Sequence, residues 1–421
     1  MQAATVAALQ SPGLISKKLA RDRLLFRWTW RNLRGKKAAY PNHRGPIVIM
    51  PKNVVFRSGL KITLLLASAL LTVGMHAQSA ARLDDAVTIG ADNPSIRYSG
   101  RSEGIGTAKV TFGYSGARQR LRFTGTSVGV LMDDEKGANY AMAWIDGQPG
   151  EKFQLNARDG FYPLAHGLKE GEHTVEVVRV TECFLGLTSF RGFVLDRGAK
   201  ALPWRDVHER RIEFIGDSIT CGYGVEVDDP KLHFVPATEN YCFGYSALAA
   251  RQLDADTLVV ARSGIGMLRN YDGPRDGSKD AMPEIYPHTF YLQAKPEWDF
   301  SRFTPDVVCV NLGTNDFSTT GVNVDKFVAS YVNFGTMLLK RYPHAQLVIL
   351  QGPMDTSKAL RAALDRVIGQ LPADASQRIH FLALSPMGSA GYGADSHPNR
   401  AQSEINAAEL SAFLSKLMAW R

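Results

Sequence analysis

The sequence predicts an α/β protein in which an antiparallel β-sandwich precedes a domain built on a parallel sheet. Two different patterns of apolar and polar residues, in two parts of the chain, predict this fold. Between about 84 and 200, short stretches of alternating apolar and polar residues are separated by glycine-rich turns, and from 211 onward apolar runs of strand length alternate with helical patterns. The length of 421 residues is sufficient for two domains.

The first domain is expected to span residues 84–200. Strand-like stretches recur about every ten residues, as in "AKVTFGYSG", "YAMAWIDGQPGEKFQL" and "GEHTVEVVRVTE". One of them contains Asp146-Gly147, a dipeptide that two-residue hairpin turns favour. Short strands with frequent turns are typical of a sandwich, and residues 197–210 are interpreted as the linker to the next domain.

The second domain is expected to span residues 210–421. Two segments, 323–343 and 399–420, repeat apolar residues with helical spacing, so each presents one apolar face. Alternating strands and helices of this kind predict a parallel sheet that is covered on both faces. The apolar runs with the length of strands are 212–215, 257–261, 307–311, 347–350 and 379–384.

Basic residues are concentrated near the N-terminus. The formal net charge is +8, but residues 1–49 hold ten Lys or Arg and one acid, and residues 50–80 hold three basic residues and no acidic one. The remainder has 36 basic and 40 acidic residues, a net charge of −4. The folded body therefore lacks the positive charge that nucleic-acid binding requires, and no nucleic-acid partner is expected.

A secretory signal peptide is predicted at residues 50–77. A basic stretch precedes an apolar run of twelve residues at 62–73, and Met75-His76-Ala77 resembles a small-residue cleavage site. The run is shorter than the roughly 20 residues of a membrane span, so the protein is expected to be secreted or periplasmic, without stable membrane association. Met50 stands at the usual distance from such a signal, so residues 1–49 are interpreted as an over-translated segment or a disordered basic extension.

The spacing of the four cysteines matches no Cys-x-x-Cys metal motif. Export permits disulfides, and Cys221 with Cys242 is the pair considered for a bridge, with free thiols as the open alternative. Cys309 lies within an apolar strand and is expected to be a buried thiol.

Polar residues follow four of the five predicted strands of the second domain. The first strand is followed by Gly-Asp-Ser with Ser218, the second by a glycine turn with Gly264, the third by Asn315, and the fifth by Asp395 and His397. Ligands bind beyond the carboxyl ends of the strands in parallel sheets, so these residues are expected to meet. One such feature would be weak evidence, but four at the same edge indicate an active site.

This set of groups suits acyl transfer by a serine nucleophile. His397 is expected to activate Ser218 and then to protonate the leaving alcohol, and Asp395 is expected to fix the tautomer of the imidazole. The expected oxyanion donors are the backbone N–H groups of Ser218 and Gly264 and the side-chain amide of Asn315. Glycine at position 264 would allow a close approach of the backbone.

The blocks around Ser218, Gly264, Asn315 and His397 resemble those of the SGNH, or GDSL-type, hydrolases. Longer strings such as "IGDSITCGYG", "ARSGIGM", "WDFSRFTPDVV" and "NLGTNDFS", with a sandwich ahead of them, resemble carbohydrate esterase family 2 over nearly all of residues 84–421. The resemblance implies a jelly-roll-like sandwich, a flavodoxin-like SGNH domain, and an acetyl xylan esterase-like activity. Such enzymes remove acetyl groups from plant polysaccharides such as xylan and glucomannan, and no metal or cofactor is implied.

One spacing departs from this resemblance. Most SGNH hydrolases place the acid three residues before the histidine, whereas Asp395 precedes His397 by two. Members of the family use either the acid or a backbone carbonyl to orient the histidine, so both arrangements remain open. Asp395 could also bond to nearby loop backbone, as aspartates often do in turns.

Aromatic residues near the blocks are candidates for sugar contacts. Trp298 could stack on a sugar ring or pack beneath the loop that follows it. Tyr223, beside the nucleophile, and Phe317, close after Asn315, are further candidates. The expected partner is an acetylated polysaccharide or oligosaccharide, and the oligomeric state is left open.

Two other functions fit the sequence. A lipase or thioesterase on the same scaffold would act on other acyl esters, and a glycan-binding protein would carry an inactive SGNH domain. The complete set of four blocks favours an enzyme over a binding protein.

Overall fold

The computed structural model describes residues 86–420, with the exception of 158–159, 205–209, 292, 320 and 390. The predicted N-terminal extension and signal peptide lie outside the described residues. None of the helices described is both long enough and apolar enough to cross a membrane.

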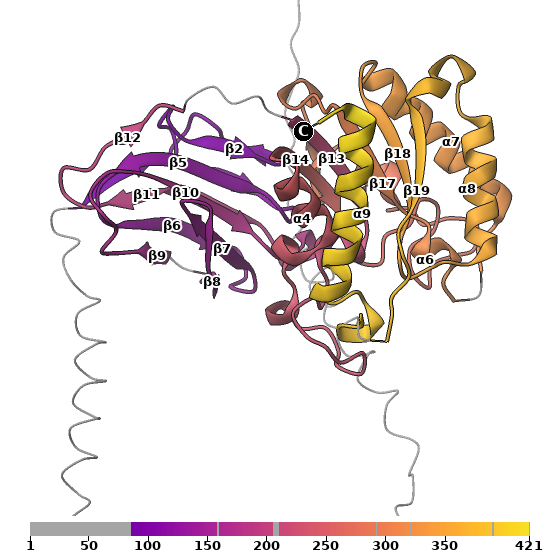
Figure 1. Cartoon of the computed structure of the whole chain (residues 1–421), viewed down its shortest axis with the longest axis horizontal. Coiled ribbons are helices and arrows are strands. Elements are labelled where there is room, and N and C mark those ends of the chain that lie inside the picture. Colours follow the sequence, from indigo (N-terminus) through magenta and orange to yellow (C-terminus); the bar gives the residue numbers. More distant parts are fainter. Residues whose placement is uncertain are drawn as a thin grey trace, which may run out of the picture. The chain divides into compact units, whose positions relative to one another are not determined.

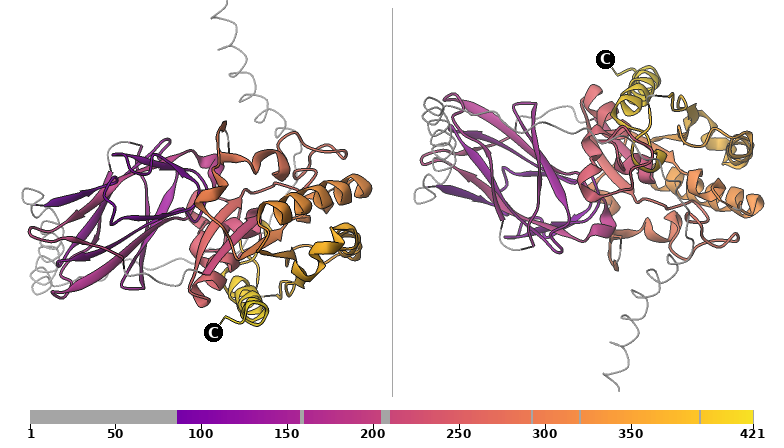
Figure 2. Two further views of the ribbon diagram at one scale, coloured as in Figure 1. Left: turned by 90° about the horizontal axis from the view of Figure 1, so that it is seen from above. Right: turned by 90° about the horizontal axis from the view of Figure 1, so that it is seen from below.

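The N-terminal domain is an antiparallel sandwich of two sheets, as predicted (Figures 1 and 2). One sheet has the order β3-β4-β11-β6-β9, with β1 also paired to β11, and the other has the order β12-β5-β10-β7-β8, with β2 also paired to β5. Buried side chains of the sandwich, among them Phe112, Phe190 and Phe193, form its core. The strands are β1 (Val87–Gly90), β2 (Arg97–Ser99), β3 (Ser102–Glu103), β4 (Val110–Phe112), β5 (Arg118–Thr124), β6 (Val128–Asp134), β7 (Tyr140–Ile145), β8 (Gln148–Gln154), β9 (Gly160–Ala165), β10 (Glu172–Arg179), β11 (Thr188–Leu195) and β12 (Ala201–Leu202).

The predicted hairpin is confirmed between β7 and β8. Ile145 pairs with Gln148, and the two residues between them, Asp146 and Gly147, have φ angles of 50° and 78°. Positive φ at both positions is what a type I′ turn requires, and Asp-Gly is a preferred pair for it. The end of the sandwich differs from the prediction, because β12 lies inside the segment interpreted as the linker and pairs with β5.

The C-terminal domain contains a five-stranded parallel sheet in the order β14-β13-β17-β18-β19. Numbered along the chain this order is 2-1-3-4-5, which is flavodoxin-like and confirms the predicted fold class. Every strand overlaps its predicted apolar run, because positions covered on both faces of a sheet favour β-branched and other apolar side chains. The strands are β13 (Arg210–Gly216), β14 (Ala255–Ala261), β17 (Val307–Asn311), β18 (Gln346–Gln351) and β19 (Ile379–Ala383), and a separate pair comprises β15 (His288–Phe290) and β16 (Gln293–Glu297).

Helices cover both faces of the parallel sheet (Figure 1). On one face α4 and α9 pack together, and Leu410 joins the core around Phe214. On the other face α7 and α8 pack together, and Tyr331 joins the core around Val310. The helices α7 and α9 are the two that the sequence predicts. The helices are α3 (Ser218–Cys221), α4 (Tyr245–Gln252), α5 (Met282–Ile285), α6 (Thr314–Phe317), α7 (Val324–Arg341), α8 (Lys358–Gln370) and α9 (Arg400–Met418).

A buried arginine of the sandwich reaches strand β13 of the parallel sheet. The fully buried side chains of Arg101 and Glu213 form an ion pair with 3.6 Å between Nη2 and Oε1. Arg101 also donates to the main-chain carbonyl groups of Tyr286 and His288, and Glu213 accepts a 2.8 Å hydrogen bond from the Tyr286 hydroxyl. A buried charge is costly without such partners, so this contact ties the two domains together.

All four cysteines are buried free thiols, so the bridge considered between Cys221 and Cys242 is not formed. The Cys221 thiol instead faces the carboxylate of Glu182, with 3.9 Å between Sγ and Oε2. Cys242 packs in the apolar core beneath α4. Cys309 is a buried residue of β17, as predicted.

Candidate active site

The nucleophile candidate stands at the carboxyl end of β13. A Cβ atom on Gly216 would lie 2.1 Å from Oγ1 of Thr220, so only glycine fits where the strand turns into α3. The Asp217 carboxylate caps this short helix by accepting the N–H of Ile219 at 3.0 Å. Ser218 is consequently the first residue of α3, and it is 6% exposed.

The imidazole of His397 lies against this serine. Its Nε2 is 2.8 Å from Oγ of Ser218, although the two residues are 179 positions apart. Its Nδ1 is 3.2 Å from the carbonyl oxygen of Ala394, and since a carbonyl only accepts, Nδ1 carries the proton. The Nε2 lone pair therefore faces the serine hydroxyl. Burial lowers the pKa of His397 to about 4, so the ring is neutral and able to accept a proton near pH 7.

The carboxylate of Asp395 makes no hydrogen bond to His397, which corrects the expectation of an acid in a triad. It accepts hydrogen bonds from the hydroxyl of Tyr223 at 2.7 Å, from Nδ1 of His233 at 2.7 Å, and from the N–H of Phe234 at 2.9 Å. Asp395 and Ser396 both have left-handed backbone, with φ of 48° and 61°. This turn brings His397 back onto the carbonyl of Ala394, which is the alternative arrangement left open by the sequence.

The three expected oxyanion donors converge on the same edge of the sheet. Gly216 at the end of β13 is in register with the last residues of β14 and β17, so the loops that follow these strands start side by side. Asn315 on α6 connects them, because its Nδ2 donates to the carbonyl of Ile265 at 2.9 Å and to Asp217 at 3.3 Å. Within the described part of the chain, no acceptor takes the N–H of Ser218 or of Gly264.

The glycine at position 264 is required for its backbone conformation. Its φ is 77°, in the left-handed region that residues with a Cβ atom rarely adopt. A Cβ atom there would meet nothing closer than Cβ of Tyr271, at an ordinary 3.7 Å. The positive φ is thus a second reason for glycine at this position, beside the close approach expected from the sequence.

Comparison with known proteins identifies the family. Two family models match the chain, the carbohydrate esterase 2 N-terminal family over residues 98–204 and the GDSL-like lipase/acylhydrolase family over residues 214–405. A solved structure of a family two carbohydrate esterase from Clostridium thermocellum, in complex with cellohexaose, is 34% identical with a TM-score of 0.72, and the match covers 77% of this chain and 100% of that one. The chain belongs to carbohydrate esterase family 2.

Two curated relatives agree with this assignment. The cellulase/esterase CelE of Acetivibrio thermocellus is 36% identical over 80% of this chain, which spans only 41% of the length of that relative. An acetylxylan esterase / glucomannan deacetylase of Cellvibrio japonicus is 29% identical over 85% of this chain and 98% of its own length.

In this family 2 protein, aromatic rings support the histidine. The Tyr223 ring lies on the His397 ring with 4.1 Å between centroids and 31° between planes. On its other side it stacks on Phe234, at 4.4 Å and 23°. Tyr223 was expected to contact sugar, and its observed contacts make it a support for the imidazole.

The loop of Gly264 is tethered by Asp316, a role that sequence reasoning missed. The buried Asp316 carboxylate accepts the N–H groups of Met267, Leu268 and Arg269 at 2.7–2.9 Å. Burial raises the pKa of Asp316 to about 6 in spite of these hydrogen bonds, which lower it. Its position after Asn315 in "TND" is the only sequence signal that could have suggested a role at this edge.

The two other candidates for sugar contacts, Trp298 and Phe317, differ in their exposure. Trp298 is 4% exposed, and the guanidinium groups of Arg302 and Arg101 lie 4.6 Å and 5.7 Å from its ring. Its faces are therefore covered, which favours packing beneath the loop, the second of the two alternatives, over stacking on a sugar ring. Phe317 is half-buried and meets Phe327 edge to face at 5.1 Å.

Proposed function

We propose that this family 2 protein is a secreted O-acetylesterase that removes acetyl groups from plant polysaccharides, such as xylan and glucomannan, through a serine acyl-enzyme. The observation that carries the proposal is the 2.8 Å contact between Oγ of Ser218 and Nε2 of a neutral His397. The names of the relatives, esterase and acetylxylan esterase / glucomannan deacetylase, support the substrate class.

Acylation begins with attack by Ser218. Its Oγ forms a bond to the acetyl carbonyl carbon while its proton passes to Nε2 of His397. The carbonyl oxygen becomes an oxyanion, for which the N–H groups of Ser218 and Gly264 are proposed donors. The amide of Asn315 is the third proposed donor, and it exchanges its longer hydrogen bond, the one of 3.3 Å to Asp217, for the oxyanion. His397 then returns the proton to the sugar oxygen as its bond to the acetyl carbon breaks, so that the sugar alcohol leaves and the acetyl group remains on Ser218.

Deacylation repeats these steps with water. His397 accepts a proton from water as the water oxygen attacks the acetyl-serine, and the second tetrahedral intermediate collapses to acetic acid with the proton returned to Oγ of Ser218. The acetic acid then ionises to acetate in water. The positive charge that forms on the imidazole in each half-reaction faces the carbonyl dipole of Ala394 on Nδ1. Every step uses groups of the chain itself, and the proposal includes no metal or cofactor.

Replacement of the nucleophile tests the proposal. Ser218→Ala is expected to abolish acetate release from an aryl acetate and from acetylated xylan, while the melting temperature stays close to that of the wild type. Most of the activity surviving in this variant would refute the acyl-enzyme. A series of esters from acetyl to octanoyl tests the acyl group, since rising activity along the series would favour a lipase or thioesterase.

Secretion is tested separately. Intact-mass analysis of the exported protein is expected to give an N-terminus near Gln78, after the small residues that end the predicted signal. A mature protein that retains residues 1–49 would contradict this part of the proposal.

A further inference from the structure

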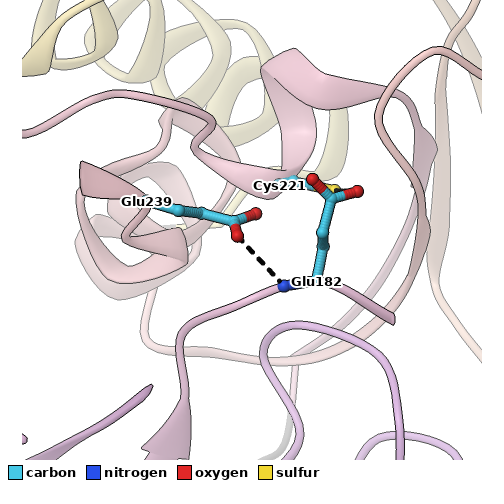
Figure 3. Close-up of side chains that lie close together, drawn as sticks. All are labelled: Glu182, Cys221 and Glu239. Carbon is cyan, nitrogen blue, oxygen red and sulfur yellow. Dashed lines mark hydrogen bonds between the residues drawn. The ribbon is translucent and has the colours of Figure 1, made fainter. Parts of the chain in front are cut away.

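Three buried residues next to the active site form a group that the proposed reaction does not use. Figure 3 shows Glu182, Cys221 and Glu239, whose side chains are all buried. Glu182 belongs to the sandwich, in the connection between β10 and β11, whereas Cys221 ends α3 and Glu239 precedes the segment leading to α4. The oxygen and sulfur atoms that these residues offer lie within 4.8 Å of one another.

The Glu182 carboxylate makes two hydrogen bonds to Ser263, the residue that precedes Gly264. Its Oε2 accepts the backbone N–H of Ser263 at 2.6 Å, and its Oε1 accepts the Ser263 hydroxyl at 2.5 Å. The N–H of Gly264 belongs to the peptide unit that joins Ser263 to Gly264. Two hydrogen bonds to one residue hold its N–H and its side chain in place, so they restrain the peptide unit that follows, which carries the N–H of Gly264.

Glu182 is itself held in place on both sides of its backbone. Its N–H donates to Oε2 of Glu239 at 3.2 Å, which is the dashed contact in Figure 3, and its carbonyl accepts from Nη2 of Arg179 at 2.9 Å. The thiol of Cys221, three residues after the nucleophile, faces the same carboxylate at 3.9 Å. One fixed side chain thus contacts both the helix that carries Ser218 and the loop of the expected oxyanion donor.

Hydrogen bonds, protons and the nearby Arg179 and Arg262 account for this group, so no metal ion is invoked. Both oxygens of Glu182 already accept short hydrogen bonds from Ser263. Burial raises the pKa of Glu182 to about 7, and burial together with the charge of Glu182 raises the pKa of Glu239 well above its ordinary value. Burial also raises the pKa of the Cys221 thiol, which keeps it neutral.

We infer that Glu182 is a positioning residue for the esterase reaction, through which the sandwich orients the Gly264 N–H toward the developing oxyanion. The inference rests on the proposed function, since it assigns a role within that reaction. It gives the N-terminal domain a part in catalysis at a distance from the substrate, because Glu182 acts through Ser263.

Kinetics of Glu182 variants test the inference. Glu182→Ala is expected to lower kcat about ten- to a hundredfold with KM nearly unchanged. A displaced oxyanion donor weakens binding of the transition state but does not change the affinity for substrate. Glu182→Gln is expected to retain kcat within about threefold, since its amide oxygen can accept the Ser263 N–H and its amide N–H can donate to the Ser263 hydroxyl. Retained activity in Glu182→Gln would show that the reaction needs the hydrogen bonds to Ser263 and does not need the charge of Glu182.

Glu176 supplies the matched control. It is a second glutamate of the sandwich that bonds across to the C-terminal domain, at 2.5 Å to Arg251, and it also lies 3.5 Å from Arg118. Glu176→Ala is expected to lower the melting temperature with kcat unchanged. Equal losses of kcat in Glu176→Ala and Glu182→Ala, or a Glu182→Ala variant that loses only thermal stability, would overturn the inference.

Ser263→Ala keeps the test usable if Glu182→Ala does not fold. It removes one of the two hydrogen bonds from the other end and is expected to lower kcat by several-fold, with KM unchanged. An unchanged kcat in Ser263→Ala would count against the inference. Acetate release by Ser218→Ala would defeat the proposed function instead, whereas an inactive Ser218→Ala beside a fully active Glu182→Ala would defeat this inference alone.

Discussion

The hydroxyl of Tyr223 donates a 2.7 Å hydrogen bond to Oδ2 of Asp395, while the ring of the same tyrosine lies against the imidazole of His397. Asp395 therefore supports the histidine through an aromatic ring and through the turn that presents the Ala394 carbonyl. A carboxylate in direct contact with the imidazole would have a different and larger effect.

Replacing Asp395 is expected to have a moderate effect. Asp395→Ala should lower kcat about tenfold, far from the roughly 10⁴-fold loss on removing the acid of a triad. Tyr223→Phe, which keeps the ring but loses the hydrogen bond, should lose less than Tyr223→Ala, which loses both. Measuring kcat on an aryl acetate for the three variants checks this order, and a 10⁴-fold loss in Asp395→Ala would restore it as the triad acid.

The pH dependence should reflect the low pKa of His397. Burial lowers this pKa to about 4, so the fall in kcat/KM that protonation of His397 causes is expected as the pH drops through about 4. Any change that protonation of Glu182 or Asp316 causes is expected at higher pH, since their pKa values are raised to about 7 and about 6. The unfolded chain takes up this proton near pH 6.5, so His397 also makes the folded state less stable as the pH falls from about 6.5 toward 4. A profile of kcat/KM that shows no fall as the pH drops through about 4 would contradict the lowered pKa of His397.

Alanine at position 264 should affect catalysis through backbone strain. The φ of 77° costs a residue with a Cβ atom about 1–2 kcal/mol, so Gly264→Ala is expected to relax this turn, displace the N–H and lower kcat. Gly147 is a matched control, because its φ is 78° and a Cβ atom there would meet nothing within 4 Å. Both variants should lose similar stability in chemical denaturation, and a similar loss of kcat in both would contradict a special role for Gly264.

Trp298 should matter for stability and not for substrate affinity. Because Trp298 is a buried aromatic residue, Trp298→Ala is expected to destabilise the protein by about 3–5 kcal/mol. KM for acetylated polysaccharide should match the wild type when measured well below the melting temperature. A large rise in KM with unchanged stability would instead make Trp298 a sugar contact.

Much of the fold was predictable, because parallel strands buried on both faces leave a strong apolar pattern. The same physics placed Ser218, Gly264 and Asn315, since residues after parallel strands share one edge. The role of Asp395 was not predictable, because it depends on two successive left-handed residues that its sequence does not demand. The role of Trp298 was ambiguous, because a tryptophan beside Arg302 is compatible both with an exposed position on the surface and with a buried position beneath a loop. Glu182 left no signal, since its partner Ser263 is 81 residues away in the other domain.

The ion pair between Arg101 and Glu213 limits how this chain can be divided. A gene fragment encoding only residues 210–421 would remove Arg101, the ion-pair partner of Glu213, and breaking a buried pair in this way costs about 3–5 kcal/mol. That loss is a large share of the net stability of an ordinary domain. The smallest portable module for fusion to other proteins is therefore the sandwich and the α/β domain together.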